Sequence, residues 1–436
     1  MAETASCVGR ISAAELKAQL FARSDELAVL DVRTERRFGT GHLLAASSAP
    51  LGGLEAHARR LVPRRSTPVV LCSDEGDELT GRAAGFLQDA GYSDLLVLDG
   101  GTEGWSGSGY RLFSGLNTPG KALAAFAQRE LRIPLITPAA LGNRVKRGET
   151  VRIIDCRPAA EFRKGTIPGA INVPGAELAR CAGRLTQGTD LLVVTCAGQS
   201  RGLTGAQMLR DAGYPGTVMA LERGTMGWEL SGRPMEAGRE VRVDVEAAGN
   251  SLLERAARIR AVAGIRTASA GKLNEILGEG RRTTVLFDVR RSEEFEAGHI
   301  SGARHVPGGQ LIHKIDQHLA TANARLVLSD DDGVRATFAA LWLRRMGWGD
   351  VYVAALADGG YDLETRLDSP ETVVVDRTAD SKPGEAYLKP SDLPPGTERN
   401  RAIESYLGGT DDMLAQVLDD GSLNLQALPV EFVRGQ

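Results

Sequence analysis

The chain has 436 residues, and its 52 basic residues nearly balance its 56 acidic ones. This length exceeds one compact core, so roughly two to four domains are expected. The balanced charge gives no basis for binding nucleic acid or a membrane surface, and no apolar run reaches the length of about 18 residues that a transmembrane helix needs.

Five cysteines are scattered along the chain, without Cys-x-x-Cys pairs and without histidines at the spacing of metal ligands. We therefore expect free thiols, no metal and no cofactor. The first ten residues lack a basic segment followed by an apolar one, so no secretory signal is expected. Together these features favour a reducing compartment, the cytoplasm.

The same sequence pattern is repeated three times along the chain. Each copy opens with an apolar run that ends in Asp-x-Arg, and a glycine precedes the residue eleven positions after the aspartate. The three segments are Asp31-Val32-Arg33, Asp155-Cys156-Arg157 and Asp288-Val289-Arg290, and the residues eleven positions further on are His42, Thr166 and His299. Such matched spacing indicates repeated domains.

Each copy continues with a second apolar run, a loop, a helical segment and a third short apolar run. Apolar strands that alternate with helices of about 10–15 residues predict βαβ units and a parallel sheet. The expected fold class is therefore α/β, with each copy of about 100 residues forming a central parallel sheet flanked by helices.

The segments between the copies also have readable patterns. Helical segments at 118–134 and 238–264 are expected to join the copies, and the second presents an apolar face that should pack between the second and third copies. The repeat stops near residue 369, where an extended Pro-rich linker precedes two short expected helices, at 399–407 and 411–418. The expected domains are 9–117, 135–237 and 265–366, followed by a C-terminal extension, 367–436.

The middle copy carries the most informative loop. The apolar run 191–194 predicts a buried strand, Cys196 follows it, and a polar turn leads into a helix. A cysteine there lies among backbone N–H groups at the positive end of the helix dipole, which favours the nucleophilic thiolate. The alternative is a buried structural cysteine. The nearby Gly198, Ser200 and Arg201 are poor core residues and favour the functional interpretation.

These motifs together resemble the rhodanese family, over roughly residues 9 to 365, as three tandem domains. The third copy carries the opening motif most completely, in residues 288–307. The second copy departs from it at Thr166, where the family usually has a histidine that serves the fold. The resemblance implies small α/β domains and, in active members, sulfane sulfur carried as a persulfide on the loop cysteine.

Only the middle copy is expected to be active. Counting back seventeen residues from the glycine that ends each helix reaches, in chain order, Asp74, Cys196 and Asp330. An aspartate has no sulfur to carry, and its charge opposes an anionic donor. Cys72, two residues before Asp74, is expected to be a packed thiol of the strand.

The resemblance implies a sulfurtransferase of the thiosulfate type. Cys196, the expected catalytic residue, attacks the outer sulfur of a small-molecule donor, and an acceptor such as cyanide or a thiol then removes the sulfur from the persulfide. Loop N–H groups would stabilise its negative charge, and the family's pattern makes Asp155 and Arg157 a structural pair that adds positive potential. The expected substrate-binding residues are Ala197, Gly198, Gln199, Ser200, Arg201, Gly202 and Arg157.

Two further cysteines need separate interpretations. Cys156 stands where the other copies have valines, which predicts a buried apolar role. Cys181, on an expected helix over 176–184, is a candidate second thiol that would resolve the persulfide.

Two other functions stay open at this point. A related fold hosts phosphatases with a Cys-x5-Arg loop, but Cys196 and Arg201 enclose four residues, a shorter loop that suits sulfur better than phosphate. The Cys-Gly-Ser/Thr-Gly-Val-Thr loop of mercaptopyruvate-type enzymes is absent. The second possibility is a non-enzymatic sulfur-relay or scaffold protein. The outer copies are expected to shield the middle site or to hold a homodimer.

Overall fold

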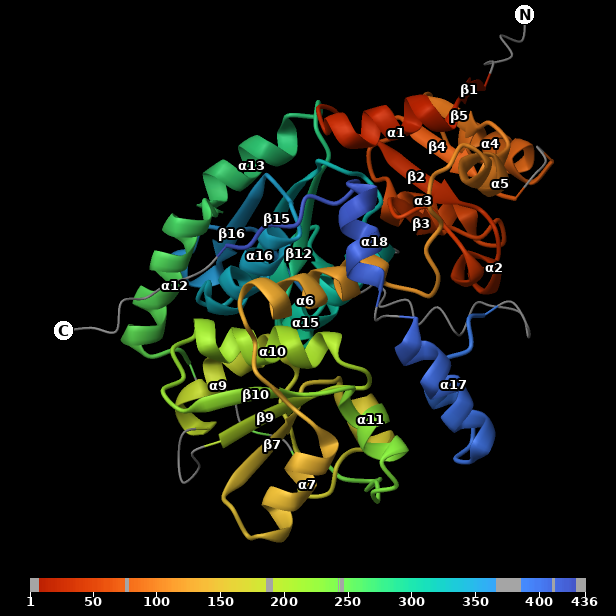
Figure 1. Cartoon of the computed structure of the whole chain (residues 1–436). Helices are drawn as coiled ribbons and strands as arrows, with labels where there is room; N and C mark the ends of the chain where they lie inside the picture. The colour runs from red at the N-terminus through yellow and green to blue at the C-terminus, as the bar shows by residue number, and fades with distance from the viewer. Residues whose placement is uncertain are drawn as a thin grey trace, which may run out of the picture.

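The computed structural model describes residues 8–74, 78–185, 191–241, 243, 247–365, 386–409 and 412–428. Within them the chain forms three α/β domains, with the connecting helices between them and C-terminal segments against them (Figure 1). The expected α/β class with three repeats is confirmed.

The elements follow one another in nearly the same sequence in each domain. The first domain has β1 (Gly9–Ile11), α1 (Ala13–Ala22), β2 (Ala28–Asp31), α2 (Glu35–Thr40), β3 (Ala46–Ser48), α3 (Leu54–Leu61), β4 (Val69–Cys72), α4 (Glu78–Asp89), β5 (Leu95–Leu98) and α5 (Gly101–Gly107). The middle domain has β6 (Leu135–Ile136), α7 (Pro138–Lys146), β7 (Val151–Asp155), α8 (Ala159–Lys164), β8 (Ile171–Asn172), η1 (Gly175–Glu177), α9 (Leu178–Leu185), β9 (Leu191–Thr195), α10 (Ser200–Asp211), β10 (Thr217–Leu221) and α11 (Gly224–Leu230). The third domain has β11 (Arg266–Thr267), α13 (Ala270–Gly278), β12 (Thr284–Asp288), α14 (Ser292–Ala297), β13 (His299–Ile300), β14 (Arg304–His305), α15 (Gly308–His318), β15 (Arg325–Asp330), α16 (Val334–Arg345), β16 (Val351–Ala355), η2 (Leu356–Asp358) and β17 (Leu363–Glu364).

Each domain has a five-stranded sheet with the same strand order. The orders are β1-β5-β4-β2-β3, β6-β10-β9-β7-β8 and β11-β16-β15-β12-β14, and every ladder in these sheets is parallel. The third domain adds a short antiparallel pair, β13 with β17. All five residues of β9 are buried, as expected for a central strand covered by helices on both faces.

Two connecting helices lie between the domains. Helix α6 (Thr118–Glu130) packs against α10 of the middle domain and α15 of the third (Figure 1). Helix α12 (Asn250–Ala263) packs on α16, and its Arg255 donates a hydrogen bond to the Asp211 carbonyl at 2.5 Å. The predicted position of α12 between the second and third domains is therefore confirmed, although the helix begins at Asn250.

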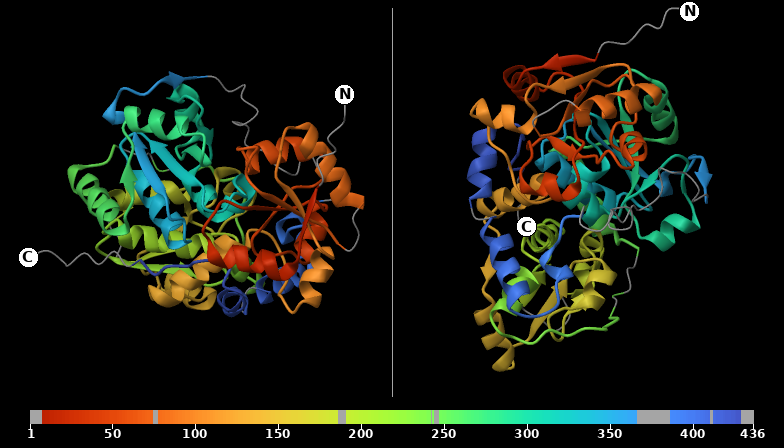
Figure 2. Two further views of the ribbon diagram at one scale, coloured as in Figure 1. Left: turned by 90° about the horizontal axis from the view of Figure 1, so that it is seen from above. Right: turned by 90° about the vertical axis from the view of Figure 1, so that its right-hand side faces the viewer.

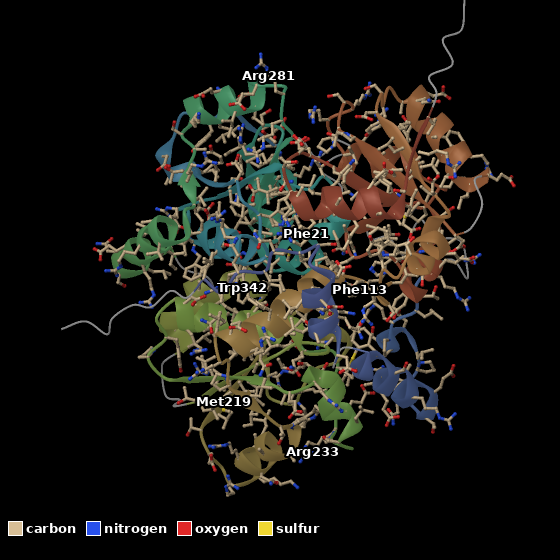
Figure 3. All side chains as sticks on the ribbon, turned by 45° about the horizontal axis from the view of Figure 1, so that its top comes forward. Phe21, Phe113, Met219, Arg233, Arg281 and Trp342 are labelled. Atoms are coloured by element: carbon tan, nitrogen blue, oxygen red, sulfur yellow. The ribbon has the colours of Figure 1, made fainter. Side chains whose placement is uncertain are left out.

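The middle and third domains share one hydrophobic core, which includes Trp342, fully buried on α16. Figure 3 shows this side chain at the junction of the two domains. A buried ion pair also joins them, from Arg345 Nη1 to Asp211 Oδ2 at 2.7 Å. The first domain contacts the third through Arg304, which donates to the Arg60 carbonyl at 2.7 Å.

The C-terminal segment runs across all three domains, as the two views of Figure 2 allow the reader to follow. It contains η3 (Pro390–Asp392), α17 (Thr397–Gly408) and α18 (Met413–Asp420). Arg399 pairs with Glu229 of the middle domain at 2.9 Å, Asp420 with Lys17 of the first at 2.7 Å, and Gln426 donates its N–H to the Arg345 carbonyl of the third at 2.8 Å. Both predicted helices of this segment are present. Of the predicted Pro-rich linker, Lys382-Pro383-Gly384 lies outside the described residues, whereas Lys389 and Leu393 are extended on either side of the single turn η3. Among the described helices none is long and apolar enough to cross a membrane.

Candidate functional site

Strand register fixes which residues of the three domains correspond. The Asp of each Asp-x-Arg motif pairs across its sheet with Cys72, Thr195 or Ser329, so the next residues, Ser73, Cys196 and Asp330, occupy equivalent positions. Cys196 thus follows the central strand at the carboxyl end of the sheet, where α/β folds place their ligands.

The expectation that Asp74 stands at the cysteine position is wrong, because Ser73 has that register. The first domain has one residue more between this position and the glycine that ends its helix, so a count from the helix end overshoots. Asp330 in the third domain has the predicted position. Serine, like aspartate, has no sulfur, so the expectation that these two loops are inactive stays as a prediction.

Cys196 is covered by protein. It is 2% exposed and lies in the core shared by the middle and third domains. Burial raises the pKa of its thiol, while the nearby Arg201 and the Gly202 N–H, which donates to the sulfur, act in the opposite direction. The expectation that the loop lowers this pKa is therefore not met in this conformation, because desolvation of the thiolate outweighs the effects of Arg201 and the Gly202 N–H.

The loop is held from outside by the start of α11. The N–H groups of Thr225 and Met226 donate to the carbonyls of Cys196 and Ala197, at 2.7 and 2.9 Å. Because a trans peptide points its N–H opposite to its C=O, the N–H groups of Ala197 and Gly198 point away from α11. Hydrogen bonds from the backbone of α11 thereby orient the peptide groups of the loop.

Three of the predicted substrate-binding side chains, Gln199, Arg201 and Arg157, are engaged within the protein. Gln199 Oε1 accepts a hydrogen bond from the Arg223 N–H at 2.9 Å, which fastens the loop to the turn before α11. Arg201 Nη1 and Nη2 each donate to Glu161 at 2.8 Å, a bidentate pair. Ser200 begins α10, and Gly202 passes close to the Val194 carbonyl, 3.2 Å from where a Cβ would lie.

Glu161 was not singled out from the sequence. Burial opposes its ionisation, but the charge and hydrogen bonds of Arg201 outweigh burial and lower the pKa of Glu161 to about 2. The third domain repeats the pair with Arg335 and Glu294, at 2.7 Å. The sequence signal for this ion pair is a glutamate directly before the motif phenylalanine, combined with an arginine five residues after the position of Cys196 or Asp330.

Arg157 forms the structural pair expected from the family pattern. Its Nε and Nη2 donate to Asp155, at 2.6 Å for the shortest contact, and Nη2 also donates to the Gly165 carbonyl. In the outer domains the remaining nitrogen, Nη1, binds the carboxylate of Asp74 or Asp331, one residue past the cysteine position. The middle domain has Ala197 there, which leaves no carboxylate between Arg157 and the loop.

The other described cysteines are buried. Cys156 donates to the carbonyls of Thr195 and Arg201, at 3.1 and 3.3 Å, so it packs beneath the loop as predicted. Cys72 ends β4 and is fully buried. Cys181 is 1% exposed on α9, where burial raises its pKa to about 12, which does not favour a resolving thiol. Cys7 lies outside the described residues.

The C-terminal helix α17 covers the Cys196 loop, a role that sequence analysis did not assign. Leu407 packs with Met226 and Ala197, and the Tyr406 ring lies 3.4 Å from where a Cβ of Gly198 would be. Figure 1 shows α17 beside α11. Residues so far apart in the chain leave no local signal of this contact.

The pH dependence of thiol reactivity follows from the burial of Cys196. Because only the thiolate reacts and its pKa is raised, the rate of Cys196 alkylation by iodoacetamide should rise about tenfold per pH unit from pH 6 to above pH 9. Mass spectrometry of the Cys196 peptide measures the rate. A plateau below pH 8 would show instead that the loop lowers the pKa.

Gly224 is required by the loop geometry. Its φ is +55°, and a Cβ would collide with the carbonyl oxygens of Cys196, Ala197 and Gly198. We expect Gly224→Ala to displace the loop and to lower the sulfur transfer that the family resemblance implies, measured as thiocyanate formed from thiosulfate and cyanide, by about a hundredfold or more. Gly232→Ala is the matched control, because its φ is +71° and nothing lies within 4 Å of the added carbon. It should cost only about 1–2 kcal/mol of stability, with activity retained; equal activity losses in both variants would contradict the role of Gly224.

The middle domain has a parallel sheet with a cysteine loop after its central strand, and the two similar domains that flank it lack this cysteine. These features define a class of tandem α/β proteins with one candidate reactive thiol. The chain belongs to the rhodanese family: the Rhodanese-like domain model matches residues 12–108, 137–231 and 269–363.

Curated relatives match parts of the chain. HTH-type transcriptional regulator Rv0324 of Mycobacterium tuberculosis is 40% identical over 108 residues, which are 24% of this chain and 46% of that protein. The 3-mercaptopyruvate sulfurtransferase of Escherichia coli K12 is 35% identical over 121 residues, 24% of this chain and 41% of that protein. The chain therefore spans less than half the length of these two. Thiosulfate sulfurtransferase GlpE of Ectopseudomonas mendocina is 37% identical over 79 residues, 18% of this chain and 68% of that protein.

One solved structure matches nearly the whole chain. The crystal structure of a thiosulfate sulfurtransferase from Pseudomonas aeruginosa has a TM-score of 0.85 and 28% identity, and the match covers 97% of this chain and 100% of that one. The similarity thus extends beyond the single domains to their arrangement, and it relates this chain to the sulfurtransferases of the family.

Proposed function

We propose that the chain is a sulfurtransferase that carries sulfane sulfur on Cys196, from a small-molecule donor such as thiosulfate to cyanide or a thiol. The observation that carries this proposal is the register of Cys196 at the carboxyl end of the central strand, where Ser73 and Asp330 stand in the flanking domains. The cytoplasm, predicted from the free cysteines, would keep the thiol reduced.

The reaction has two steps. The Cys196 thiolate attacks the outer sulfur of thiosulfate, a bond forms between the two sulfurs, and the S–S bond of the donor breaks with its electron pair leaving on sulfite. Cyanide then attacks the outer sulfur of the persulfide, which forms thiocyanate and returns the thiolate. Gly202 N–H, Arg201 and Arg157 contribute the positive potential that favours the anionic sulfur.

Mass spectrometry tests the proposal directly. After incubation with thiosulfate, the peptide that contains Cys196 should gain the mass of one sulfur atom, about 32 Da, and cyanide should remove it with formation of thiocyanate. The Cys72, Cys156 and Cys181 peptides serve as internal controls and should stay unchanged. Sulfur on another cysteine, or on none, would contradict the proposal.

A second candidate is a sulfur-relay protein that receives sulfur from a partner and does not turn over small donors. The flanking domains favour it, because they have Ser73 and Asp330 at the cysteine position and could bind partners instead. Steady-state thiosulfate–cyanide turnover distinguishes the two. Turnover that depends on Cys196 supports the enzyme, whereas a persulfide that forms without turnover supports the relay.

A further inference from the structure

Positively charged side chains from outside the middle domain lie beside the Cys196 loop. Lys121, on the connecting helix α6, is 7% exposed, and its Nζ lies 4.5 Å from the centre of the Tyr406 ring. The same ring lies against Gly198 of the loop. One aromatic ring therefore separates this ammonium group from the loop backbone.

A second lysine comes from the third domain. Lys314 interrupts α15 with non-helical backbone angles, φ −131° and ψ 29°. Burial lowers the pKa of Lys314, and the charges of Lys389 and Arg201 lower it further, while Glu161 and Asp316 act in the opposite direction. Helix α15, which carries Lys314, contacts both α6 and α10, the helix that follows the cysteine loop and carries Arg201.

His313 stands next to Lys314 on α15. Burial and the charges of Arg201, Lys314 and Lys121 lower its pKa well below the usual value, and Glu161 opposes them. Helix α6 contacts α15 at the same place, where Gly120 lies against the His313 backbone (Figure 1).

The charges in this cluster do not balance. Glu161 is fully engaged by Arg201, and within the described residues no carboxylate forms an ion pair with Lys121 or Lys314. Lys121 has a packing role through its cation–π contact with Tyr406, worth about 0.5–2 kcal/mol. That contact does not account for Lys314. Desolvated cations without a counter-charge are costly in a fold and favour an anionic ligand.

We propose that Lys121 and Lys314 bind the charged end of the sulfur donor at Cys196, and that they select doubly charged donors over singly charged ones. The inference rests on the proposed function. It gives the connecting helix and the third domain a role in specificity. In the transfer step, the S–S bond of the donor breaks and its electron pair leaves on the sulfonyl sulfur, so the two lysines would also stabilise the departing dianion, sulfite.

Kinetics with two donors test the selection by charge. Thiosulfate, a dianion, and methanethiosulfonate, a monoanion, both carry a transferable sulfur. We expect Lys121→Met and Lys314→Met each to lower kcat/KM for thiosulfate about tenfold or more, mainly through KM, and to lower that for methanethiosulfonate about threefold or less. Lys121→Arg and Lys314→Arg should restore the preference. Lys272→Met, an exposed lysine of the third domain, should change neither value.

Equal losses with both donors, or no change with either, would overturn the inference. Thermal unfolding identifies a variant that fails to fold. If Lys121→Met is unstable, Lys314→Met alone tests the selection by charge, because the Lys314 side chain is half-buried and forms no ion pair among the described residues. Sulfite binding to Cys196→Ala, measured by calorimetry, separates this inference from the proposed function. Binding that weakens about tenfold on adding Lys314→Met supports the anion site even without turnover, and binding insensitive to Lys314 contradicts it even with turnover.

Discussion

Replacing Cys196 by serine is expected to abolish sulfur transfer from thiosulfate to cyanide. A serine hydroxyl cannot form a persulfide, and no other described cysteine has the register at the end of the central strand. Removal of a nucleophile from a covalent mechanism costs several orders of magnitude, so we expect a loss of about ten-thousandfold or more in kcat. Serine fits the space of the thiol, so the thermal midpoint of the chain should change little.

The reciprocal variant is the control. A chain with alanine at Cys72, Cys156 and Cys181, which retains Cys196, should transfer sulfur at a rate within about tenfold of the unmodified chain. A decrease in rate of up to about tenfold would reflect altered packing, because all three thiols are buried. Thiocyanate production by Cys196→Ser at the unmodified rate would exclude this residue as the sulfur carrier. Hydrolysis of a generic aryl phosphate that depends on Cys196 would revive the phosphatase interpretation.

The repeated architecture could be predicted because it is written in local patterns. Apolar runs ending in Asp-x-Arg become the strands β2, β7 and β12, and short amphipathic segments become α17 and α18. The position equivalent to Cys196 in the first domain could not be predicted as well. Only the pairing of Asp31 with Cys72 across the sheet shows that Ser73 occupies it, because the loop and helix that follow have one extra residue.

The surroundings of the candidate site were less predictable than its loop. The position of Cys196 follows from the sequence, but the lowered thiol pKa expected from it does not, because the cover of α17 and the shared core arise only in the folded chain. Tyr406 reaches the loop from a distant part of the sequence, and Lys121 lies against the Tyr406 ring. Glu161 is an intermediate case, since its motif repeats in the third domain as Glu294.

The third domain shows what replaces a cysteine in this loop. The Asp330 carboxylate accepts hydrogen bonds from the N–H groups of Gly333 and Arg335, at 2.7 and 2.8 Å. Burial, opposed by Arg335 and these hydrogen bonds, raises the pKa of Asp330 to about 7. The domain therefore retains backbone donors that can hold negative charge, but its own side chain occupies them. In the third domain, the loop after β15 instead helps to join this domain to the middle domain.

Arg335 is the centre of that attachment, and its replacement by methionine is expected to destabilise the chain by about 3–5 kcal/mol. The side chain is fully buried, and its guanidinium binds Asp331 at 2.5 Å, Glu294 at 2.7 Å and Glu177 of the middle domain at 3.0 Å. Removing the cation leaves Glu177, itself buried, without its counter-charge. Arg281→Met is the control, since Arg281 projects from the outer edge of the third domain (Figure 3) and should change stability by less than about 0.5 kcal/mol.

The loss in Arg335→Met should depend on pH in a direction that the site determines. Burial already raises the pKa of Glu177 against the charge of Arg335, so without Arg335 the folded-state pKa rises further above its unfolded value. A carboxyl group with a raised pKa binds its proton more tightly in the folded chain, so its contribution to stability is present at low pH and is lost as the pH rises through that range. Denaturant midpoints should therefore show a larger loss at pH 8 than at pH 5, and Glu177→Gln in the Arg335→Met background should recover part of the loss at pH 8 only. An equal loss at both pH values, unaffected by Glu177→Gln, would mean that Arg335 stabilises the junction through packing and not through its charge.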